Sequence, residues 1–579
     1  MTPDAPTRGE RSQAWFGAAG RGALTHRGML LALGLGPDAT SGRPVIGIGS
    51  SASDLNPCNA HLGGLADAVA RGVWQGGGVP LVFPTMSLGE AMMRPTTMLY
   101  RNLMAMEVEE VIRANPLDGV VLLSGCDKTT PAMLMALASV DLPGMLISGG
   151  PKLNGKYCGE DLGSGTSLRR FEREINAGRM SMEEYDIADS GTNRSGGHCN
   201  TMGTASTMAC VVEALGMQLS GMASYPAVDK RRYALAHKAG LRIIEMVKDD
   251  LTPGTIMTRD AFENAIRVNA AIGGSTNAIV HLLAIAGRVG VPLSLDDFDR
   301  LGRDVPLLVD LMPSGRFLME DFCYAGGLPA LIEQLGGLLH REAITVSGRS
   351  IGDDVNGARV WGPKVIRSLD DPCLPAGSAT AVLHGNLCPD GAVIKQSAAS
   401  PHLLVHRGKA LVFDSPEEYH EVIDDPDIPI DSDTVIVVRN AGPVGYPGMP
   451  EVADVPVPTK LTRQGVNDVV RISDGRMSGT GFGTVVLHVA PEASIGGPLS
   501  LVRNGDWVSL DVPGRSLTLE VEDAELDRRR ALSPVGERAD LEGSGYVSLY
   551  RRHVLQADRG VDFDFLVGRR GRDVPRDSH

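Results

Sequence analysis

The hydrophobic pattern changes near residue 385, and this change restricts the possible folds more than any other feature of the sequence. Before that point, short apolar runs alternate with stretches of helical periodicity, which is typical of a mainly parallel sheet covered by helices. After it, short β-type runs alternate with turns, which favours a barrel or a sandwich. We therefore predict an α/β fold class, with an N-terminal α/β/α domain over residues 1–385 and a C-terminal β-rich, barrel-like domain over residues 386–579.

Several elements of the first domain can be placed from their periodicity. Residues 44–49 and 119–125 are short apolar runs that predict buried strands. Residues 62–73 predict a helix, with one apolar face made of Leu62, Leu65, Ala66, Val69 and Val73. A further helix is predicted to begin near Thr204, with an apolar face made of Met208, Val211, Val212, Leu215 and Leu219.

The second domain is predicted from short strands and turns. Residues 392–394, 410–413, 434–438 and 484–487 are β-type runs. Residues 506–521 alternate apolar and polar side chains on both sides of Pro513-Gly514, which predicts a β-hairpin. The chain from Arg569 onward is rich in Arg and Asp, and we expect it to fray.

Length and charge limit the classes of protein and partner. A chain of 579 residues exceeds the size of a single hydrophobic core, in agreement with two large domains. The formal net charge of −15 argues against nucleic acid or an anionic membrane as a partner. The first residues, MTPDAPTRGERSQ, lack the apolar segment of a signal peptide, and no run approaches the ~20 apolar residues that span a bilayer. We therefore expect a cytoplasmic protein.

Three of the eight cysteines share one context. Cys58, Cys126 and Cys199 each stand just before a predicted helix, and the first two also follow predicted strands. The loops that leave the carboxyl ends of parallel strands meet in one crevice, so these thiols can come together despite separations of 68 and 73 residues. Helix amino-terminal ends also favour thiolates. The alternative is that each is a small buried hydrophobic residue, as most cytosolic cysteines are.

Three thiolates suit one kind of chemistry better than others. A 2Fe-2S cluster has four terminal ligand positions, so three cysteines leave one iron position open to act as a Lewis acid toward a leaving hydroxyl group. A pure electron carrier needs no open position. Cys388 would close that position, so we assign it to packing together with the other remaining cysteines, Cys158, Cys210, Cys323 and Cys373.

Five longer motifs accompany these cysteines. They are Asn56-Pro-Cys-Asn-Ala-His-Leu, Gly125-Cys-Asp-Lys-Thr-Thr-Pro-Ala, Gly197-His-Cys-Asn-Thr-Met-Gly-Thr-Ala-Ser-Thr-Met, Gly442-Pro-Val-Gly-Tyr-Pro-Gly-Met-Pro-Glu and Ser473-Asp-Gly-Arg-Met-Ser-Gly-Thr. In this order, from about residue 40 to about residue 560, the chain resembles the dihydroxy-acid and sugar-acid dehydratase family, and most closely its pentonate branch.

The resemblance implies two cofactors, both placed mainly in the first domain. The first is a 2Fe-2S cluster held by Cys58, Cys126 and Cys199, with a 4Fe-4S cluster as the alternative. The second is a magnesium ion, and the positions that match its ligands are Glu90, Asp127, Lys128 and Glu451, with Lys128 carbamylated to N6-carboxylysine. A carbamate supplies the oxygen that magnesium prefers. Without the resemblance, the two glutamates would be interpreted as surface carboxylates, Asp127 would be interpreted as a helix cap, and Lys128 would be interpreted as an unmodified cation.

The resemblance also assigns the catalytic base to the second domain. Ser478 matches the catalytic serine, which would act as an alkoxide and contact the substrate, and Thr480 would help to hold the substrate. A serine in a glycine-rich loop is otherwise a turn former. The segment Gly273-Gly-Ser-Thr-Asn opens a helix and is compatible either with anion binding or with a structural turn.

The implied function is that of a hydro-lyase, in which both metals act as Lewis acids and no net redox change occurs. The expected substrate is an aldonate, with a pentonate such as L-arabinonate or D-xylonate ahead of a hexonate, and the expected product is the 2-keto-3-deoxy acid. Dehydration of 2,3-dihydroxy-isovalerate, a step of branched-chain amino-acid synthesis, is the runner-up, and a non-catalytic iron-sulfur redox protein is a remote alternative. The resemblance also implies a homodimer or a homotetramer.

Overall fold

The N-terminal part of the computed structural model is built on a parallel sheet. The structure describes residues 11–36, 38–176, 178–453, 455–532 and 544–573. Four parallel strands pair in the order β2-β1-β3-β4, and their bounds are Val45–Ser50 (β1), Val79–Pro84 (β2), Gly119–Ser124 (β3) and Gly144–Ser148 (β4). Strands β1, β3 and β4 are buried along their whole length, as expected for a sheet covered on both faces.

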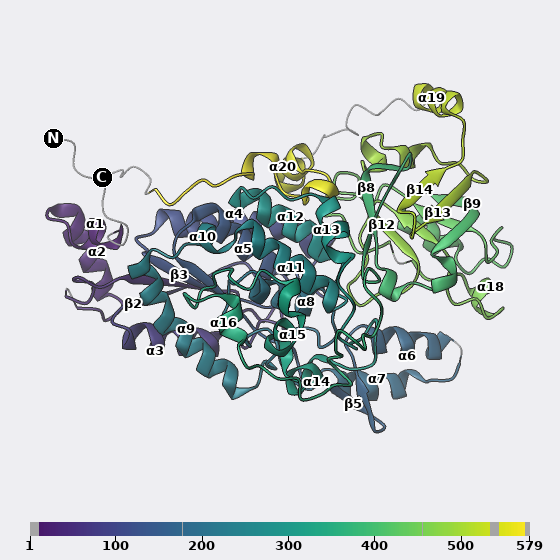
Figure 1. Cartoon of the computed structure of the whole chain (residues 1–579). Helices are drawn as coiled ribbons and strands as arrows, with labels where there is room; N and C mark the ends of the chain where they lie inside the picture. The colour runs from purple at the N-terminus through teal and green to yellow at the C-terminus, as the bar shows by residue number, and fades with distance from the viewer. Residues whose placement is uncertain (1–10, 37, 177, 454, 533–543, 574–579) are drawn as a thin grey trace.

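Helices cover both faces of this sheet (Figure 1). On one face α3 (Leu62–Gln75) packs against α9 (Lys230–Asp249), and on the other α4 (Thr97–Ala114) packs against α5 (Thr129–Val140). The contact between α3 and α9 depends on glycine, because a Cβ atom at Gly72 would lie 2.1 Å from the carbonyl oxygen of His237. The predicted strands and the helix over residues 62–73 are confirmed.

The C-terminal part is a closed barrel. Its strands follow the order β10-β11-β12-β8-β7-β14-β13-β9, and their bounds are Ala381–Gly385 (β7), Cys388–Ile394 (β8), Val405–Phe413 (β9), Val435–Val438 (β10), Arg471–Ser473 (β11), Val485–Ala490 (β12), Trp507–Asp511 (β13) and Ser516–Leu519 (β14). The predicted hairpin is confirmed, since β13 and β14 pair in antiparallel fashion and end at the pair Asp511 and Ser516. The α/β fold class with a second, barrel-like part is therefore confirmed.

One outer face of the barrel packs against the N-terminal part. Along β8, Ala392 and Ile394 belong to the interior of the barrel, whereas Val393 belongs to the large core that includes the parallel sheet. Leu487 of β12 pairs with Val393 and faces the same way. Strand alternation thus gives the barrel two buried faces, and the second one is the seam between the two parts of the molecule.

The helix expected from Thr204 onward is shorter than its apolar pattern. Helix α8 spans Thr204–Ala214 and stops before two of the residues that were predicted to lie on its face, Leu215 and Leu219. The chain turns at Gly216, whose φ of 78° is in the left-handed region that favours glycine. Both leucines are nevertheless buried in the same core. The apolar pattern therefore predicted their burial correctly but placed the end of the helix too far along the chain.

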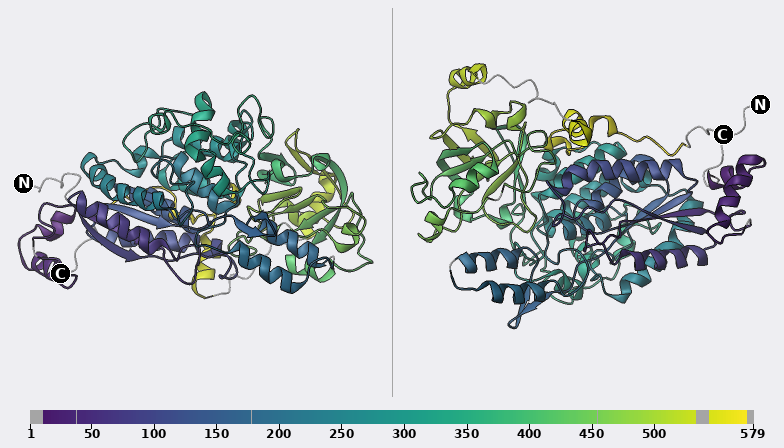
Figure 2. Two further views of the ribbon diagram at one scale, coloured as in Figure 1. Left: turned by 90° about the horizontal axis from the view of Figure 1, so that it is seen from below. Right: turned by 180° about the vertical axis from the view of Figure 1, so that it is seen from behind.

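The chain end returns to the N-terminal part. After α20 (Gly545–His553), the segment runs back along the helices of the first part (Figure 2). Arg288 is fully buried there, and its Nε lies 2.7 Å from Asp562 Oδ2. Arg570 pairs with the buried carboxylate of Glu109. The expectation that the chain frays from Arg569 is therefore wrong up to residue 573, and residues 574–579 lie outside the described residues. No helix of the described segments has both the length and the apolar character that a membrane crossing needs.

Lys395, the residue after β8, is buried in this seam. It is 2% exposed, and its Nζ has no hydrogen-bond partner among the described residues. Burial lowers the pKa of Lys395 from 10.5 to about 8. Between these two values the unfolded chain holds a proton that the folded chain lacks, so the stability contributed by this group rises with pH across the window. Below the lower value the buried ammonium costs about 3 kcal/mol.

We expect Lys395→Met to raise the free energy of unfolding near neutral pH by up to about 3 kcal/mol, because a buried thioether needs no hydrogen-bond partner. The gain should fall as the pH rises from about 8 and should vanish above 10.5, where the lysine is mostly neutral in both states. Denaturant unfolding at the two ends of this range measures both effects. An equal gain at both pH values would contradict the assignment.

Candidate active site

The structure places the three motif cysteines at the carboxyl-end side of the parallel sheet. Cys58 lies between β1 and α3, and Cys126 lies between β3 and α5. Cys126 has a φ of 66°, which is in the left-handed region. Cys199 lies in the loop before α8, next to His198, which forms an isolated bridge with Pro151. Each cysteine therefore lies before the amino-terminal end of a helix, and Cys58 and Cys126 also follow strands of the sheet, as predicted.

The thiols of Cys58 and Cys126 influence each other, because their interaction lowers the pKa of Cys58 and raises that of Cys126. The Cys126 thiol donates to Asp127 Oδ1 at 3.4 Å. Burial raises the pKa of Cys199 to about 11, and the charge of Cys58 adds to that shift. The backbone N–H of Glu90 donates to the Cys126 sulfur. A metal that binds these three sulfur atoms would displace the protons that they hold.

A second group of side chains surrounds Lys128, which is fully buried. Its Nζ lies 2.6 Å from Asp127 Oδ2, 2.9 Å from Glu451 Oε1 and 3.5 Å from Glu90 Oε2. These carboxylates come from distant segments, because Glu451 is 323 positions away along the chain. The four predicted magnesium positions therefore lie together, with the lysine nitrogen in contact with all three acids.

The electrostatics of this group are strongly coupled. Burial alone would raise the pKa of Glu90, but the charges of Lys128 and Arg476 and hydrogen bonds from Thr96 and Thr97 lower it to about 2. Burial also opposes the charge of Lys128, but Asp127 and Glu451 outweigh it and raise the pKa of the lysine. Burial raises the pKa of Glu451. Lys128 and Arg476 are thus the two cations that offset the carboxylate charges of this pocket.

No group of three or more His, Cys, Asp and Glu side chains within the described segments is arranged to hold a metal ion directly. The reason at the acidic site is visible in the distances, because an ammonium already stands between the carboxylates. Oxygen donors around one centre are nevertheless the set that a hard cation takes. Turning the lysine from a cation into an oxygen-bearing carbamate would convert this arrangement from an ion-pair cluster into a ligand set.

Ser478 lies in the loop between β11 and β12 of the barrel. Its Oγ lies 3.0 Å from Thr480 Oγ1, and the Thr480 backbone N–H donates to it at 3.3 Å. The loop rests on the N-terminal part, since a Cβ atom at Gly479 would lie 2.6 Å from the Thr204 backbone nitrogen. The barrel loop therefore places this serine beside the start of α8, which follows the Cys199 loop, across the seam between the two parts.

Residues not predicted from the sequence complete the site. Arg476 is fully buried, and its Nη1 lies 2.9 Å from Glu451 Oε1 while its Nε donates to the Met449 carbonyl at 2.6 Å. The carboxylate of Asp474 accepts from the backbone N–H of Ala441 at 2.8 Å, and burial raises its pKa to about 7. Both residues stand in the Ser473–Thr480 motif, so their position close to Ser478 in the sequence is the signal that could have identified them.

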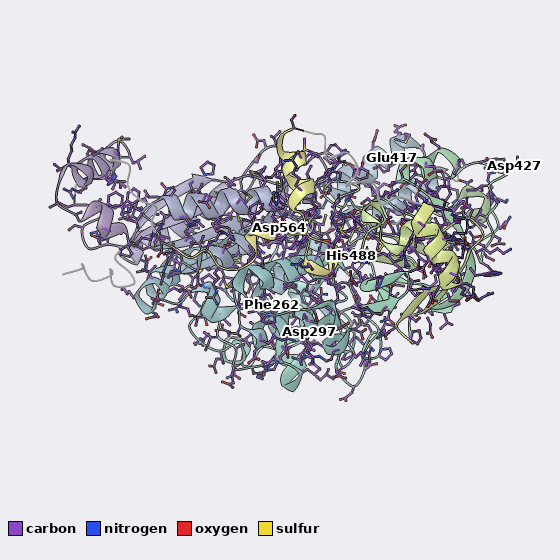
Figure 3. All side chains as sticks on the ribbon, turned by 90° about the horizontal axis from the view of Figure 1, so that it is seen from above. Phe262, Asp297, Glu417, Asp427, His488 and Asp564 are labelled. Carbon is purple, nitrogen blue, oxygen red and sulfur yellow. The ribbon has the colours of Figure 1, made fainter. Side chains whose placement is uncertain are left out.

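The interior around this motif is polar. His488 of β12 lies in the middle of the molecule, whereas Glu417 and Asp427 lie toward its far end (Figure 3). His488 is buried, and burial lowers its pKa to about 3. By contrast, Cys388 is buried in the apolar interior of the barrel, where its thiol donates to the Leu383 carbonyl at 3.5 Å. That position agrees with a packing role.

Two family models match the chain. Residues 43–354 match the model described as dihydroxy-acid/6-phosphogluconate dehydratase N-terminal. Residues 364–561 match its C-terminal counterpart. The two matches together include all the candidate site residues named above.

Relatives with curated names are similar over nearly their whole length. An L-arabinonate dehydratase of Rhizobium leguminosarum bv. trifolii is 55% identical over 571 residues, which is 98% of each chain. A 6-deoxy-6-sulfo-D-gluconate dehydratase of Pseudomonas putida is 46% identical, with 98% of this chain and 97% of the relative covered. A dihydroxy-acid dehydratase of Caldanaerobacter subterraneus subsp. tengcongensis is 38% identical, with 93% and 97% covered.

Proposed function

The chain belongs to the dihydroxy-acid/6-phosphogluconate dehydratase family, as its motifs had suggested, and from this premise we propose a specific reaction for it. The enzyme removes water from a sugar acid, a pentonate such as L-arabinonate or D-xylonate, and releases the 2-keto-3-deoxy acid. One observation carries the proposal. Three carboxylates meet around the buried Lys128, next to paired thiols, and the barrel brings Ser478 to the same seam.

The donor sets fit the two cofactors that the family resemblance implies. A 2Fe-2S cluster would be held by Cys58, Cys126 and Cys199. Analysis of iron and labile sulfide would distinguish it from a 4Fe-4S cluster. Glu90, Asp127, Glu451 and a carbamylated Lys128 would hold magnesium. When bound, the two groups supply Lewis acidity without a net change in oxidation state.

The chain's own residues supply the proton transfer. Ser478 Oγ, as an alkoxide, takes the proton from C2 of the acid, the bond between C3 and its hydroxyl oxygen breaks, and the hydroxyl leaves as water with the proton that Ser478 Oγ passes on. The resulting enol then loses the proton of its 2-hydroxyl group, gains a proton at C3 and becomes the 2-keto acid. The Thr480 N–H already donates to Ser478 Oγ, so it stabilises negative charge on that oxygen. Ser478 is half-buried, whereas Met477 and Thr480 beside it are buried.

The names of the relatives support a sugar acid as the substrate. The relative named for L-arabinonate is 55% identical and the one named for a sulfogluconate is 46% identical, whereas a D-xylonate dehydratase and a dihydroxy-acid dehydratase are each 38% identical. A pocket that hydrogen-bonds several hydroxyl groups leaves polar partners unsatisfied when a branched alkyl acid binds. We therefore favour a pentonate and keep 2,3-dihydroxy-isovalerate as the second candidate.

A keto-acid assay on the reconstituted protein tests this choice. We expect kcat/KM for L-arabinonate or D-xylonate to exceed that for 2,3-dihydroxy-isovalerate by roughly 100-fold or more, in line with the loss caused by unpaired polar groups. A hexonate in the same panel separates chain length from polarity. Faster turnover of the dihydroxy acid would select the second candidate, and no turnover of any acid would contradict the dehydratase assignment.

A further inference from the structure

The turn of residues 273–276 and the start of α12 (Asn277–Val289) face the site from the N-terminal part. The sequence left this turn open between anion binding and a structural role. Its backbone donors are in use, because Gly274 N–H bonds to the Asn269 carbonyl, Ser275 N–H to Thr207 Oγ1 and Asn277 N–H to Ser275 Oγ. Those three amides are not available to an anion.

The side chain of Asn277 reaches further than the turn itself. It is fully buried, and its Nδ2 lies 2.7 Å from Glu451 Oε1, 3.0 Å from Thr204 Oγ1 and 3.1 Å from the Met477 carbonyl oxygen. These acceptors belong to three different functional segments. Glu451 is a candidate magnesium ligand, Thr204 begins the helix after Cys199, and Met477 directly precedes Ser478.

The orientation of this carboxamide is dictated by its neighbours. The Glu451 carboxylate oxygen and the Met477 carbonyl oxygen near Nδ2 can only accept hydrogen bonds. Turning the amide over would point its oxygen at that carboxylate, which is repulsive. Asn277 Oδ1 has no hydrogen-bond partner within the described segments. The asparagine therefore acts as a fixed donor toward Glu451 and toward the serine loop.

We propose that Asn277 is a positioning residue that fixes the position of the Glu451 carboxylate relative to the Ser478 loop across the seam. The inference rests on the proposed function, because this relative position matters only if Glu451 binds magnesium and Ser478 moves a proton. Groups that orient a metal ligand change metal affinity by roughly 10- to 100-fold when they are removed. Loss of the donor should therefore weaken magnesium binding and, separately, slow the proton transfer.

Two substitutions test this position. Asn277→Asp keeps the shape, removes the donor and sets a like charge beside Glu451, whereas Asn277→Ser withdraws the side chain without adding charge. Calorimetric titration of the reconstituted protein with magnesium chloride should show a Kd at least about 10-fold higher in both variants. At saturating magnesium, kcat should remain below the wild-type value, because the Met477 contact is also lost.

Asn264 supplies a matched control in the same part of the molecule. It is equally buried, and it exchanges two hydrogen bonds with the backbone of His340, at 3.0 Å and 2.7 Å. Asn264→Ser should lower the melting temperature and leave the magnesium Kd within about twofold of wild type, because its contacts are remote from the ligands.

Magnesium affinity that is unchanged in both Asn277 variants would overturn the inference. So would a loss confined to the melting temperature, as in the Asn264 control. A wild-type protein that binds magnesium but dehydrates none of the acids would contradict the proposed function instead, since the calorimetric comparison of variants remains valid without turnover.

Discussion

Ser478→Ala is expected to lower kcat for aldonate dehydration by roughly 10²- to 10⁴-fold, the range found when a general base is removed. Thr480 Oγ1, 3.0 Å from Ser478 Oγ, remains in the variant, but it stands in a different position and does not receive the C2 proton. The cysteines are untouched, so the visible absorbance of the iron-sulfur cluster should stay at the wild-type level. Steady-state kinetics and an absorbance spectrum of the same sample measure both quantities.

Ser516→Ala is the matched control for this variant. Ser516 and Thr518 form a similar hydroxyl pair at 3.2 Å on β14 of the barrel, outside the Ser473–Thr480 motif. We expect its kcat to be close to wild type. Full activity in Ser478→Ala would remove the serine from the mechanism. Loss of cluster absorbance together with activity would show that the loop supports the cluster rather than the proton transfer.

Lys128→Met is expected to destabilise the fold by roughly 3–5 kcal/mol and to abolish activity. Without the ammonium, the partly buried carboxylates of Asp127, Glu451 and Glu90 face one another, and the Arg476 guanidinium lies within ion-pair distance of Glu451. Urea unfolding followed by circular dichroism, with magnesium removed by a chelator, measures the loss. Lys395→Met is the control, because it also removes a buried lysine charge but is expected to stabilise the protein.

Lys128→Arg separates charge from carbamylation. A guanidinium keeps the positive charge, so this variant should recover part of the stability lost in Lys128→Met. It does not form a carbamate, so we expect no recovery of activity. An active Lys128→Arg enzyme would contradict the carbamylated lysine, and an intact-mass measurement of the wild type with and without dissolved carbon dioxide provides an independent check.

Local patterns were enough to predict the parts of the fold that depend on neighbouring residues. Strand and helix periodicity identified β1, β3 and α3, and Pro513-Gly514 marked the β13–β14 hairpin, because each is set by residues a few positions apart. The same approach predicted a longer α8 than the structure has, and it predicted fraying in a chain end that is ordered up to residue 573. Helix length depends on a turn at Gly216, and the segment after α20 is held by side chains from α4 and α12.

The motifs were enough to assign the chain to its family, because the kinds of side chains that they contain and their order are properties of the sequence. Which of these side chains lie together depends on contacts between distant segments. Lys128 pairs with a carboxylate 323 positions away, and Asn277 bonds to Glu451 across 174 positions. Such contacts leave no periodic trace in the chain, because their geometry comes from packing a barrel against a parallel sheet rather than from any local preference.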